Sequence, residues 1–273
     1  MLTLRPNSLN WALEHALQYG DTDVFPLPFE YNALRHEWAS VRGWLEKQDV
    51  LMWQVRPHRT LLSPKTRHGF RVITQLDPLD FLVFAAIVKE LGQDIENHRV
   101  PISQEVVFSY RFSPDVDGQL FDPDVGYSAF QERSLELLRS HKYVAATDIA
   151  DFYARIYHHR LENALQSATS RQSHVSAIVG LLSGWNETET FGIPVGNAPS
   201  RLLAEITIAD IDEALLAKLA PGEFVSRAHQ PAAWRGSNRI DIPPTENARS
   251  RSIRDASSSP LMPHIQGADG TAG

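Results

Sequence analysis

The chain has 273 residues, a formal net charge of −7 at pH 7 and no cysteine, which excludes a disulfide framework and a thiolate metal site. Its length suits one or two domains, and 42% hydrophobic with 22% charged residues is typical of an ordinary globular protein. Because the chain shows neither a signal peptide nor an apolar run long enough for a bilayer, we expect a cytoplasmic protein with no membrane partner.

The first 60 residues are predicted to form a mostly helical extension. Apolar residues at helical spacing indicate a helix that Asn7 or Ser8 caps and that runs through Tyr19. After a loop with two prolines, residues 31–46 show the same spacing and predict a second helix. Both apolar stripes are interpreted as packing surfaces, with no chemistry assigned to them.

A basic hairpin is predicted next. Lys65 and Arg71 flank Gly69, and residues 70–73 have the pattern of a strand. Cations beside a glycine suit a triphosphate, because they offset its charge while glycine lets the backbone come close. A solvated surface hairpin is the alternative interpretation. Residues 81–91 are apolar nearly all round, which predicts a buried helix.

The middle of the chain is predicted to supply the central strand. Residues 106–112 indicate a strand, and residues 127–140 indicate a helix with Phe130, Leu135 and Leu138 inward. Residues 143–146 are short and apolar and predict a buried strand, followed by a helix that Asp151 caps. Asp148 then lies at the end of that strand, where a carboxylate can hold a hard cation such as Mg²⁺. Alternatively, Asp148 only caps or turns the chain.

The last predicted elements are two helices. Residues 174–183 indicate a short helix, and a turn with Pro194 and Gly196 precedes a long amphipathic helix that begins at Asn197 or Ser200 and runs to about Leu219. A glycine in such a turn allows the backbone to approach a base pair. Taken alone, the same pattern also fits an ordinary loop and helix.

Three of these stretches resemble one enzyme family. Residues 148–161 (DIADFYARIYHHRL) resemble the first catalytic motif of reverse transcriptases, and residues 192–205 (GIPVGNAPSRLLAE) resemble the second. Upstream, residues 64–80 (PKTRHGFRVITQLDPLD) fit the fingers of the same family. The resemblance covers roughly residues 61–224, and it is strongest to the bacterial group that includes abortive-infection and other phage-defence enzymes.

This resemblance implies an α+β fold with the fingers and a partial palm of a right-hand polymerase, the palm being an antiparallel sheet with helices on one face. The implied regions are a helical N-terminal extension (1–60), fingers and palm (61–225) and a disordered tail (226–273). The implied activity is RNA-directed DNA polymerisation by a two-metal mechanism with Mg²⁺. The implied partners are an RNA or DNA template-primer and a deoxynucleoside triphosphate, with a protein partner or an oligomer also open.

Functional residues follow from the resemblance position by position. Asp148 is implied as the catalytic magnesium ligand, helped by the backbone carbonyl of Ile149. Lys65 and Arg71 are implied to hold the triphosphate. Tyr153 is implied to check the 2′ position of the sugar, and Gly196 and Ser200 to seat the base pair.

The third motif of the family, a hairpin with paired aspartates, is expected soon after residues 222–227 (GEFVSR) but does not follow. Residues 228–273 instead have a composition typical of disorder. One hypothesis is that the reading frame changes near Arg227, and the rival hypothesis is a genuine tail on a diverged member. An impaired polymerase is therefore expected, and the alternatives are an inactive remnant or a non-catalytic module that binds nucleic acid or a partner.

Overall fold

A computed structural model describes residues 1–64 and 69–228 of the chain, and these belong to one compact unit that spans Met1–Arg235. The described residues form nine α-helices, three short 3-10 helices and one two-stranded antiparallel sheet. A mixed helix and sheet fold is thus confirmed in its coarse form. Lys65, and all of the predicted tail beyond Ala228, lie outside the described residues.

The elements follow one another in this order. The chain begins with α1 (Pro6–Tyr19), α2 (Glu30–His36), α3 (Trp38–Leu45), η1 (Val50–Met52), β1 (Arg59–Pro64) and β2 (Phe70–Gln75). It continues with α4 (Pro78–His98), η2 (Ile102–Gln104), α5 (Tyr127–Ser140), η3 (Tyr153–Arg155), α6 (His158–Ala168), α7 (Gln172–Trp185), α8 (Ala198–Thr207) and α9 (Ala209–Lys218).

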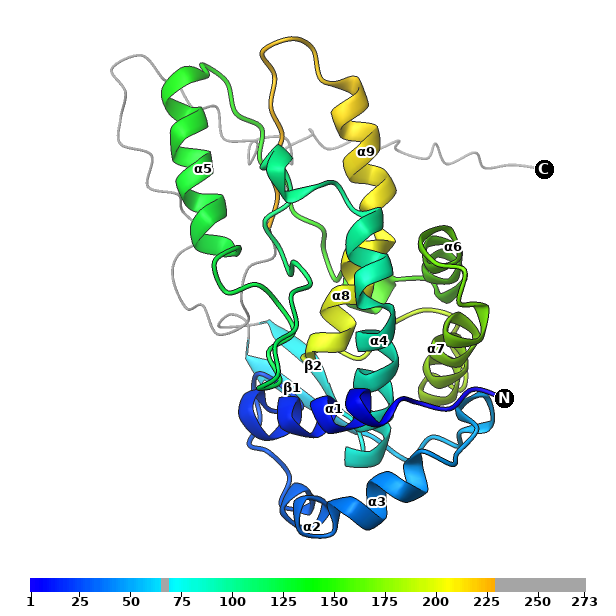
Figure 1. Cartoon of the computed structure of the whole chain (residues 1–273). Coiled ribbons are helices and arrows are strands. Elements are labelled where there is room, and N and C mark those ends of the chain that lie inside the picture. Colours follow the sequence, from blue (N-terminus) through cyan, green and yellow to red (C-terminus); the bar gives the residue numbers. More distant parts are fainter. Residues whose placement is uncertain (65–68, 229–273) are drawn as a thin grey trace, which may run out of the picture. The chain divides into compact units, whose positions relative to one another are not determined.

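Helix α4 is the centre of the core. Every residue from Asp80 to Val88 is buried, as the predicted apolar helix requires. Helices α1, α6, α7 and α8 pack around it (Figure 1). Its start is well defined, because Pro78 occupies the first turn and the Asp77 side chain accepts a hydrogen bond from the Leu79 amide at 2.9 Å. The prediction of a buried helix here is confirmed, with the helix longer at both ends.

The N-terminal helices match the prediction in place but not in detail. Helix α1 ends at Tyr19 as predicted, but it begins at Pro6 with Arg5 as its N-cap residue, because proline is favoured in a first turn. The predicted helix over 31–46 is two helices, α2 and α3, which Glu37 separates with a non-helical backbone.

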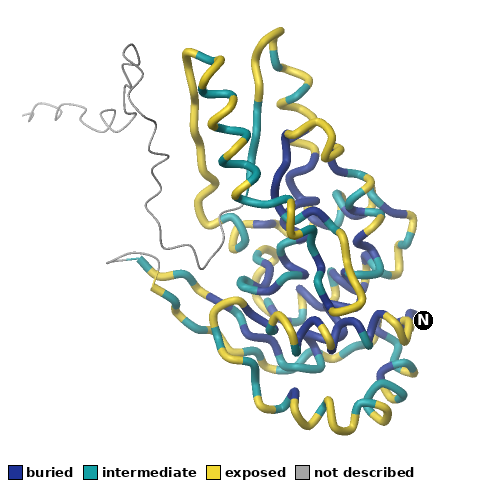
Figure 2. Tube along the Cα trace, turned by 60° about the vertical axis from the view of Figure 1, so that its left-hand side comes forward, coloured by how far each residue is buried: buried dark blue, intermediate teal, exposed yellow. Residues whose placement is uncertain are grey.

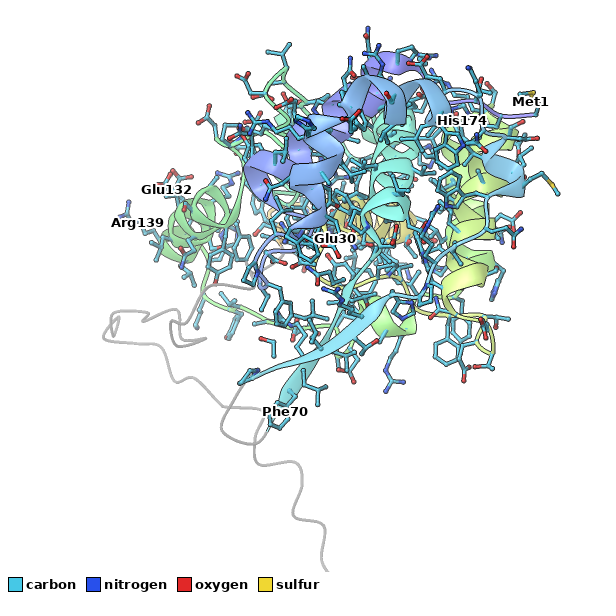
Figure 3. The ribbon with its side chains drawn as sticks, turned by 90° about the horizontal axis from the view of Figure 1, so that it is seen from below. Met1, Glu30, Phe70, Glu132, Arg139 and His174 are labelled. Carbon is cyan, nitrogen blue, oxygen red and sulfur yellow. The ribbon has the colours of Figure 1, made fainter. Side chains whose placement is uncertain are left out.

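The β-hairpin pairs Leu62 with Val72 and Pro64 with Phe70. Residues at these pairs share one face, and on that face Leu62, Phe70 and Val72 are exposed. Ile73, on the opposite face, is buried against the rest of the unit. Figure 3 shows Phe70 at the end of the hairpin that lies away from the helices.

Two predicted strands are wrong. Residues 106–112 form no strand and make only isolated bridges, Val107 with Arg227 and Phe112 with Phe121. Residues 143–146, predicted as a buried strand, are extended but exposed, with Tyr143 82% and Val144 64% accessible (Figure 2). A strand needs a neighbour for its backbone groups, and no residue in 1–64 or 69–228 pairs with this segment.

Two predicted helices need correction as well. Helix α5 has the predicted bounds, yet none of its residues is buried, and Leu135, predicted to point inward, is 41% exposed. The long helix predicted after Asn197 is divided at Ile208 into α8 and α9. No helix within the described ranges is both long and apolar enough to span a bilayer.

Candidate functional site

The three stretches singled out by the sequence are joined by backbone hydrogen bonds. The Thr74 amide of β2 donates to the Val195 carbonyl at 3.0 Å. The Ile193 amide donates to the Tyr153 carbonyl at 3.1 Å, and the Gly192 amide donates to the Ile156 carbonyl at 2.8 Å. Residues 64–80, 148–161 and 192–205, although far apart in the chain, therefore meet around the turn that precedes α8.

The Gly196 turn requires its glycine. Its φ of 107° lies in the region that other residues rarely adopt, and a Cβ atom there would stand 2.8 Å from Ile73 Cγ2. The Gly196 carbonyl also accepts a hydrogen bond from the Asp23 amide at 3.0 Å. In the described residues the backbone at Gly196 approaches β2 and the loop after α1, and its approach to a base pair stays a prediction.

Asn197 begins α8. Its side-chain Oδ1 accepts a hydrogen bond from the Ser200 amide at 2.9 Å, which caps the first turn of the helix. Ser200 is fully buried, and its hydroxyl has no hydrogen-bond partner among the described residues. The role that the structure supplies for Ser200 is in the capped turn, and its contact with a base pair stays a prediction.

A small cleft of about 190 Å³ lies beside this turn. Its walls come from the end of α1, the loop that follows α1, a loop between α4 and α5 and the start of α8. Its lining includes His15, Tyr19, Asp23, Phe121, Gly196 and Arg201.

Arg201 is the cation of the cleft. It forms an ion pair with Asp23 at 2.5 Å, and its guanidinium group lies 5.4 Å from the centre of the Tyr110 ring. Tyr110 has a φ of 46°, which is uncommon for a residue with a side chain, so the surrounding contacts hold its backbone in a costly conformation. Arg201, Asp23 and Tyr110 thus form a rigid charged group at the junction of the three stretches.

Tyr153 and Arg71 lie near this group. Burial raises the pKa of the Tyr153 phenol well above its ordinary value, and Tyr110 and Arg201 are among the groups that act on it. Burial also raises the pKa of Tyr110, while the charges of Arg201 and Arg71 oppose the shift. The structure therefore brings three of the predicted site residues, Arg71, Tyr153 and Gly196, to the surroundings of Tyr110 and Arg201.

Asp148 and Ile149 are placed differently. Both are exposed, and they follow the extended residues 143–146, which pair with no strand that the structure describes. The nearby Asp151 has a φ of 51° and forms an ion pair with Arg155 at 3.7 Å. Within residues 1–64 and 69–228, no group of three or more histidines or acids is arranged to hold a metal ion. The magnesium site at Asp148 and Ile149 stays a prediction.

A buried network of charges lies one helical turn further along α8. Glu205, which is fully buried, accepts hydrogen bonds from Arg99 at 2.7 Å and from Arg227 at 2.8 Å. Arg227 also binds Asp212 through two hydrogen bonds of 2.5 Å, and Arg99 donates to the Tyr110 carbonyl at 2.8 Å. The network therefore links α4, α8 and α9 to the loop that carries Tyr110.

Two basic residues in the region of this network, Arg111 and Arg227, have structural roles in the fold. Arg111 is buried and forms an ion pair with Glu96 at 2.5 Å. Arg227, where a change of frame was hypothesised, exchanges backbone hydrogen bonds with Val106 and Phe108 at 2.8 and 2.9 Å. Arg227 is thus an integral part of the folded unit.

Sequence reasoning missed Asp23, Tyr110 and Arg201. Arg201 lies inside the stretch 192–205, four residues before Glu205, so a charged pair one helical turn apart on an otherwise apolar helix was the available signal. Asp23 and Tyr110 lie in loops, where no periodicity marks a residue as buried or exposed.

No protein-family model matches the chain, and a search of the curated proteins finds no match.

Two buried titratable residues beside the cleft, His15 and Asp21, are expected to change the stability of the fold in opposite directions as the pH falls. Burial lowers the pKa of His15 to about 4, and its Nδ1 lies 2.6 Å from the Gly118 carbonyl oxygen. Burial raises the pKa of Asp21 to about 6. Between pH 6.5 and 4 the unfolded chain protonates His15 first, so acid destabilises the fold through His15. Between pH 6 and 3.8 the folded chain protonates Asp21 first, so acid stabilises the fold through Asp21.

We therefore expect the two residues to offset each other in the native chain and to separate in variants. In Asp21→Asn the free energy of unfolding falls by about 3 kcal/mol more between pH 6.5 and 4 than in the native chain, and in His15→Gln it falls by about 3 kcal/mol less. Urea denaturation at a series of pH values measures the free energy of unfolding of both variants. Subtracting one profile from the other removes the contribution of the titratable groups that the two variants share. Parallel profiles for the two variants would contradict the prediction.

Proposed function

We propose that this chain is a reverse-transcriptase-like nucleotidyltransferase, comprising the fingers and a partial palm of an RNA-directed DNA polymerase. The observation that carries the proposal is the junction described above. Three stretches resemble the fingers and two catalytic motifs in the order of the family, and the first two are each hydrogen-bonded to the third, residues 192–205. Stretches that resembled the family by chance would have no reason to meet in the fold.

In this proposal, Lys65 and Arg71, the latter on β2, bind the triphosphate of a deoxynucleotide through charge-assisted hydrogen bonds. Tyr153 contacts the sugar and distinguishes a 2′-hydrogen from a 2′-hydroxyl. The Gly196 turn and Ser200 face the base pair between the incoming nucleotide and the template. The cationic Arg201 adds positive potential to the same neighbourhood, although Asp23 offsets part of its charge.

Magnesium fits the described residues only in part. Asp148 and the Ile149 carbonyl supply oxygen ligands, which this hard cation prefers. Two-metal nucleotidyl transfer needs carboxylates that hold both ions about 3.5–4 Å apart, and the described residues include no group of three or more histidines or acids that could hold a metal ion. We therefore propose an impaired enzyme.

The proposal predicts slow, magnesium-dependent extension of a primer by the full chain. With a primed RNA template and deoxynucleoside triphosphates, Asp148→Asn is expected to abolish extension, because an amide replaces the anionic metal ligand. Arg71→Ala is expected to raise the KM for nucleotide at least tenfold, because one charge-assisted hydrogen bond contributes about 1.5–3 kcal/mol. Extension is followed on denaturing gels.

Asp124→Asn, a change at an exposed acid with no ion pair in the described residues, is the matched control. Extension that persists in Asp148→Asn would rule out the assigned metal ligand.

A non-catalytic nucleic-acid-binding module is the second candidate, and the partial fit of the metal site favours it. Binding to single-stranded RNA, measured across salt concentrations, tests it: each phosphate contact adds close to 0.7 to the slope of log affinity against log salt. A steep slope without extension, reduced in Arg71→Ala, supports the module. A flat slope together with no extension supports an inactive remnant.

A further inference from the structure

Residues 143–148 are an extended segment with no strand partner in the described part of the chain, and Lys142 lies at the bend that precedes it. All seven residues are exposed (Figure 2), and no hydrogen bond joins them to another residue that the structure describes. Folded proteins rarely leave an extended, partly apolar backbone unpaired, because it offers a row of donors and acceptors to any other strand. The segment is therefore a template for strand addition.

The side chains along this segment have a symmetric charge pattern. In an extended chain, Lys142, Val144, Ala146 and Asp148 share one face, and Tyr143, Ala145 and Thr147 share the other. The two charged residues stand at opposite ends, three residues on either side of Ala145. Neither Lys142 nor Asp148 has an ion-pair partner among residues 1–64 and 69–228. The segment therefore carries opposite charges at equal distances from its centre.

We propose that residues 142–148 pair with the same residues of a second copy of this chain, as an antiparallel ladder with its two-fold axis at Ala145. Lys142 of each copy then stands opposite Asp148 of the other copy, so the dimer contains two pairs of opposite charges. Tyr143 stands opposite Thr147, a pair of residue types that favour strands. The interface is isologous, as expected of a two-fold dimer.

The charge pattern selects this register over its neighbour. An axis at Ala146 would place each Asp148 opposite Val144 and each Lys142 opposite Ala150, leaving both charges without a partner.

The flanking helix also leaves room for the second copy. Helix α5, which ends two residues before Lys142, has no buried residue, and its Glu132 and Arg139 point away from the rest of the unit (Figure 3).

A ladder of seven residues buries less than the roughly 1,200 Å² of a stable interface. The dimer is therefore concentration-dependent, and the single-chain mass of 30.7 kDa should rise toward twice that value as concentration increases in sedimentation experiments. Asp148 takes part in both this inference and the proposed nucleotidyl transfer, but their tests are separate, since association is measured without nucleotide or template. A native chain that stays monomeric at every concentration would overturn it.

Disulfide trapping tests the register, and the natural absence of cysteine makes the experiment clean. In the proposed ladder, residue 145 faces its own copy with Cα atoms about 4.5–5.5 Å apart, which is within reach of a disulfide. Residue 146 is displaced along the ladder by two positions, about 8 Å from its own copy and too far for a bond. Under mild oxidation, Ala145→Cys is expected to form a covalent dimer and Ala146→Cys is not.

The Ala146→Cys protein serves as the matched control, because it carries the same exposed thiol one residue away. Circular dichroism of both variants checks that they fold alike. Crosslinking of Ala146→Cys as fast as Ala145→Cys would overturn the proposed register, and so would the absence of crosslinking in both.

Charge reversal tests the pairing of Lys142 with Asp148. Lys142→Asp alone and Asp148→Lys alone each place like charges opposite one another at two positions, and each is expected to weaken dimerisation roughly tenfold. The double variant, Lys142→Asp with Asp148→Lys, restores opposite charges and is expected to restore the dimer. A double variant that dimerises no better than the single variants would overturn the pairing.

Discussion

Glu205→Gln is expected to lower the free energy of unfolding by about 3–5 kcal/mol. Glu205 is fully buried and neutralises Arg99, whose side chain is also buried, as well as Arg227. Removing the negative charge leaves two guanidinium groups partly uncompensated away from water, and breaking a buried pair in this way costs about 3–5 kcal/mol. Urea denaturation of the full chain, followed by tryptophan fluorescence, measures the change.

The matched control for this prediction is Glu213→Gln, which makes the same chemical change on the exposed side of α9. We expect it to change stability by less than about 0.5 kcal/mol. A double-mutant cycle with Arg227→Met isolates the pair and should give a coupling free energy of about 1–3 kcal/mol. Equal stabilities for the Glu205 and Glu213 variants would show that the network contributes no net stability.

The network also has a consequence for the candidate site. Arg99, which Glu205 orients, donates hydrogen bonds to the carbonyls of Ser109 and Tyr110 at 2.7 and 2.8 Å. These bonds help to hold Tyr110 in its costly backbone conformation beneath Arg201. The charges buried around Glu205, one turn further along α8, therefore help to position the aromatic ring that lies against Arg201.

Asp80→Asn is expected to lower the free energy of unfolding by about 2–5 kcal/mol. The carboxylate of Asp80, fully buried in the first turn of α4, accepts four hydrogen bonds. They come from the indole nitrogens of Trp53 and Trp185 and from the backbone and side chain of Arg56, at 2.7–3.2 Å. An amide has one oxygen in place of two, so about two buried donors lose their acceptor at about 1–3 kcal/mol each.

Thermal and urea denaturation of Asp80→Asn measure this effect, and Asp124→Asn is again the exposed control. Because the carboxylate joins the segment after η1, the start of α4 and the end of α7, we also expect a change in the fluorescence of Trp53 and Trp185. A variant as stable as the control, with unchanged tryptophan emission, would contradict the assignment of Asp80 as a structural hub.

Periodicity identified most helices, because burial of one face leaves a local signature. The apolar run at 81–91 located α4, and the bounds of α5 agreed with the pattern at 127–140. The same signature does not say which neighbour covers a face. Hence the pattern predicts that Leu135 points inward, although Leu135 is exposed and no residue of α5 is fully buried.

Strands were predicted less well, since their pattern shows only what the residues favour and not whether a partner exists. Residues 143–146 have the composition of a buried strand, but no described segment pairs with them. Asp148 accordingly lies at the end of an exposed segment rather than at the edge of a sheet. The stretches around Gly196 were identified correctly as a glycine turn and a helix start, since both depend on local backbone geometry.

By itself, the sequence determined the central apolar helix, the glycine turn, the basic hairpin strand at Phe70–Gln75 and the order of the three stretches that resemble a polymerase. Only the tertiary structure decided that these stretches meet, that Tyr110 and Arg201 lie among them and that Arg227 pairs with the buried Glu205. It also decided that residues 142–148 pair with no strand in the part of the chain that the structure describes. The physical reason is how far apart in the sequence the interacting residues lie. Helix periodicity and turn geometry depend on neighbours a few residues away, whereas ion pairing in the interior and strand pairing depend on residues that only folding brings together.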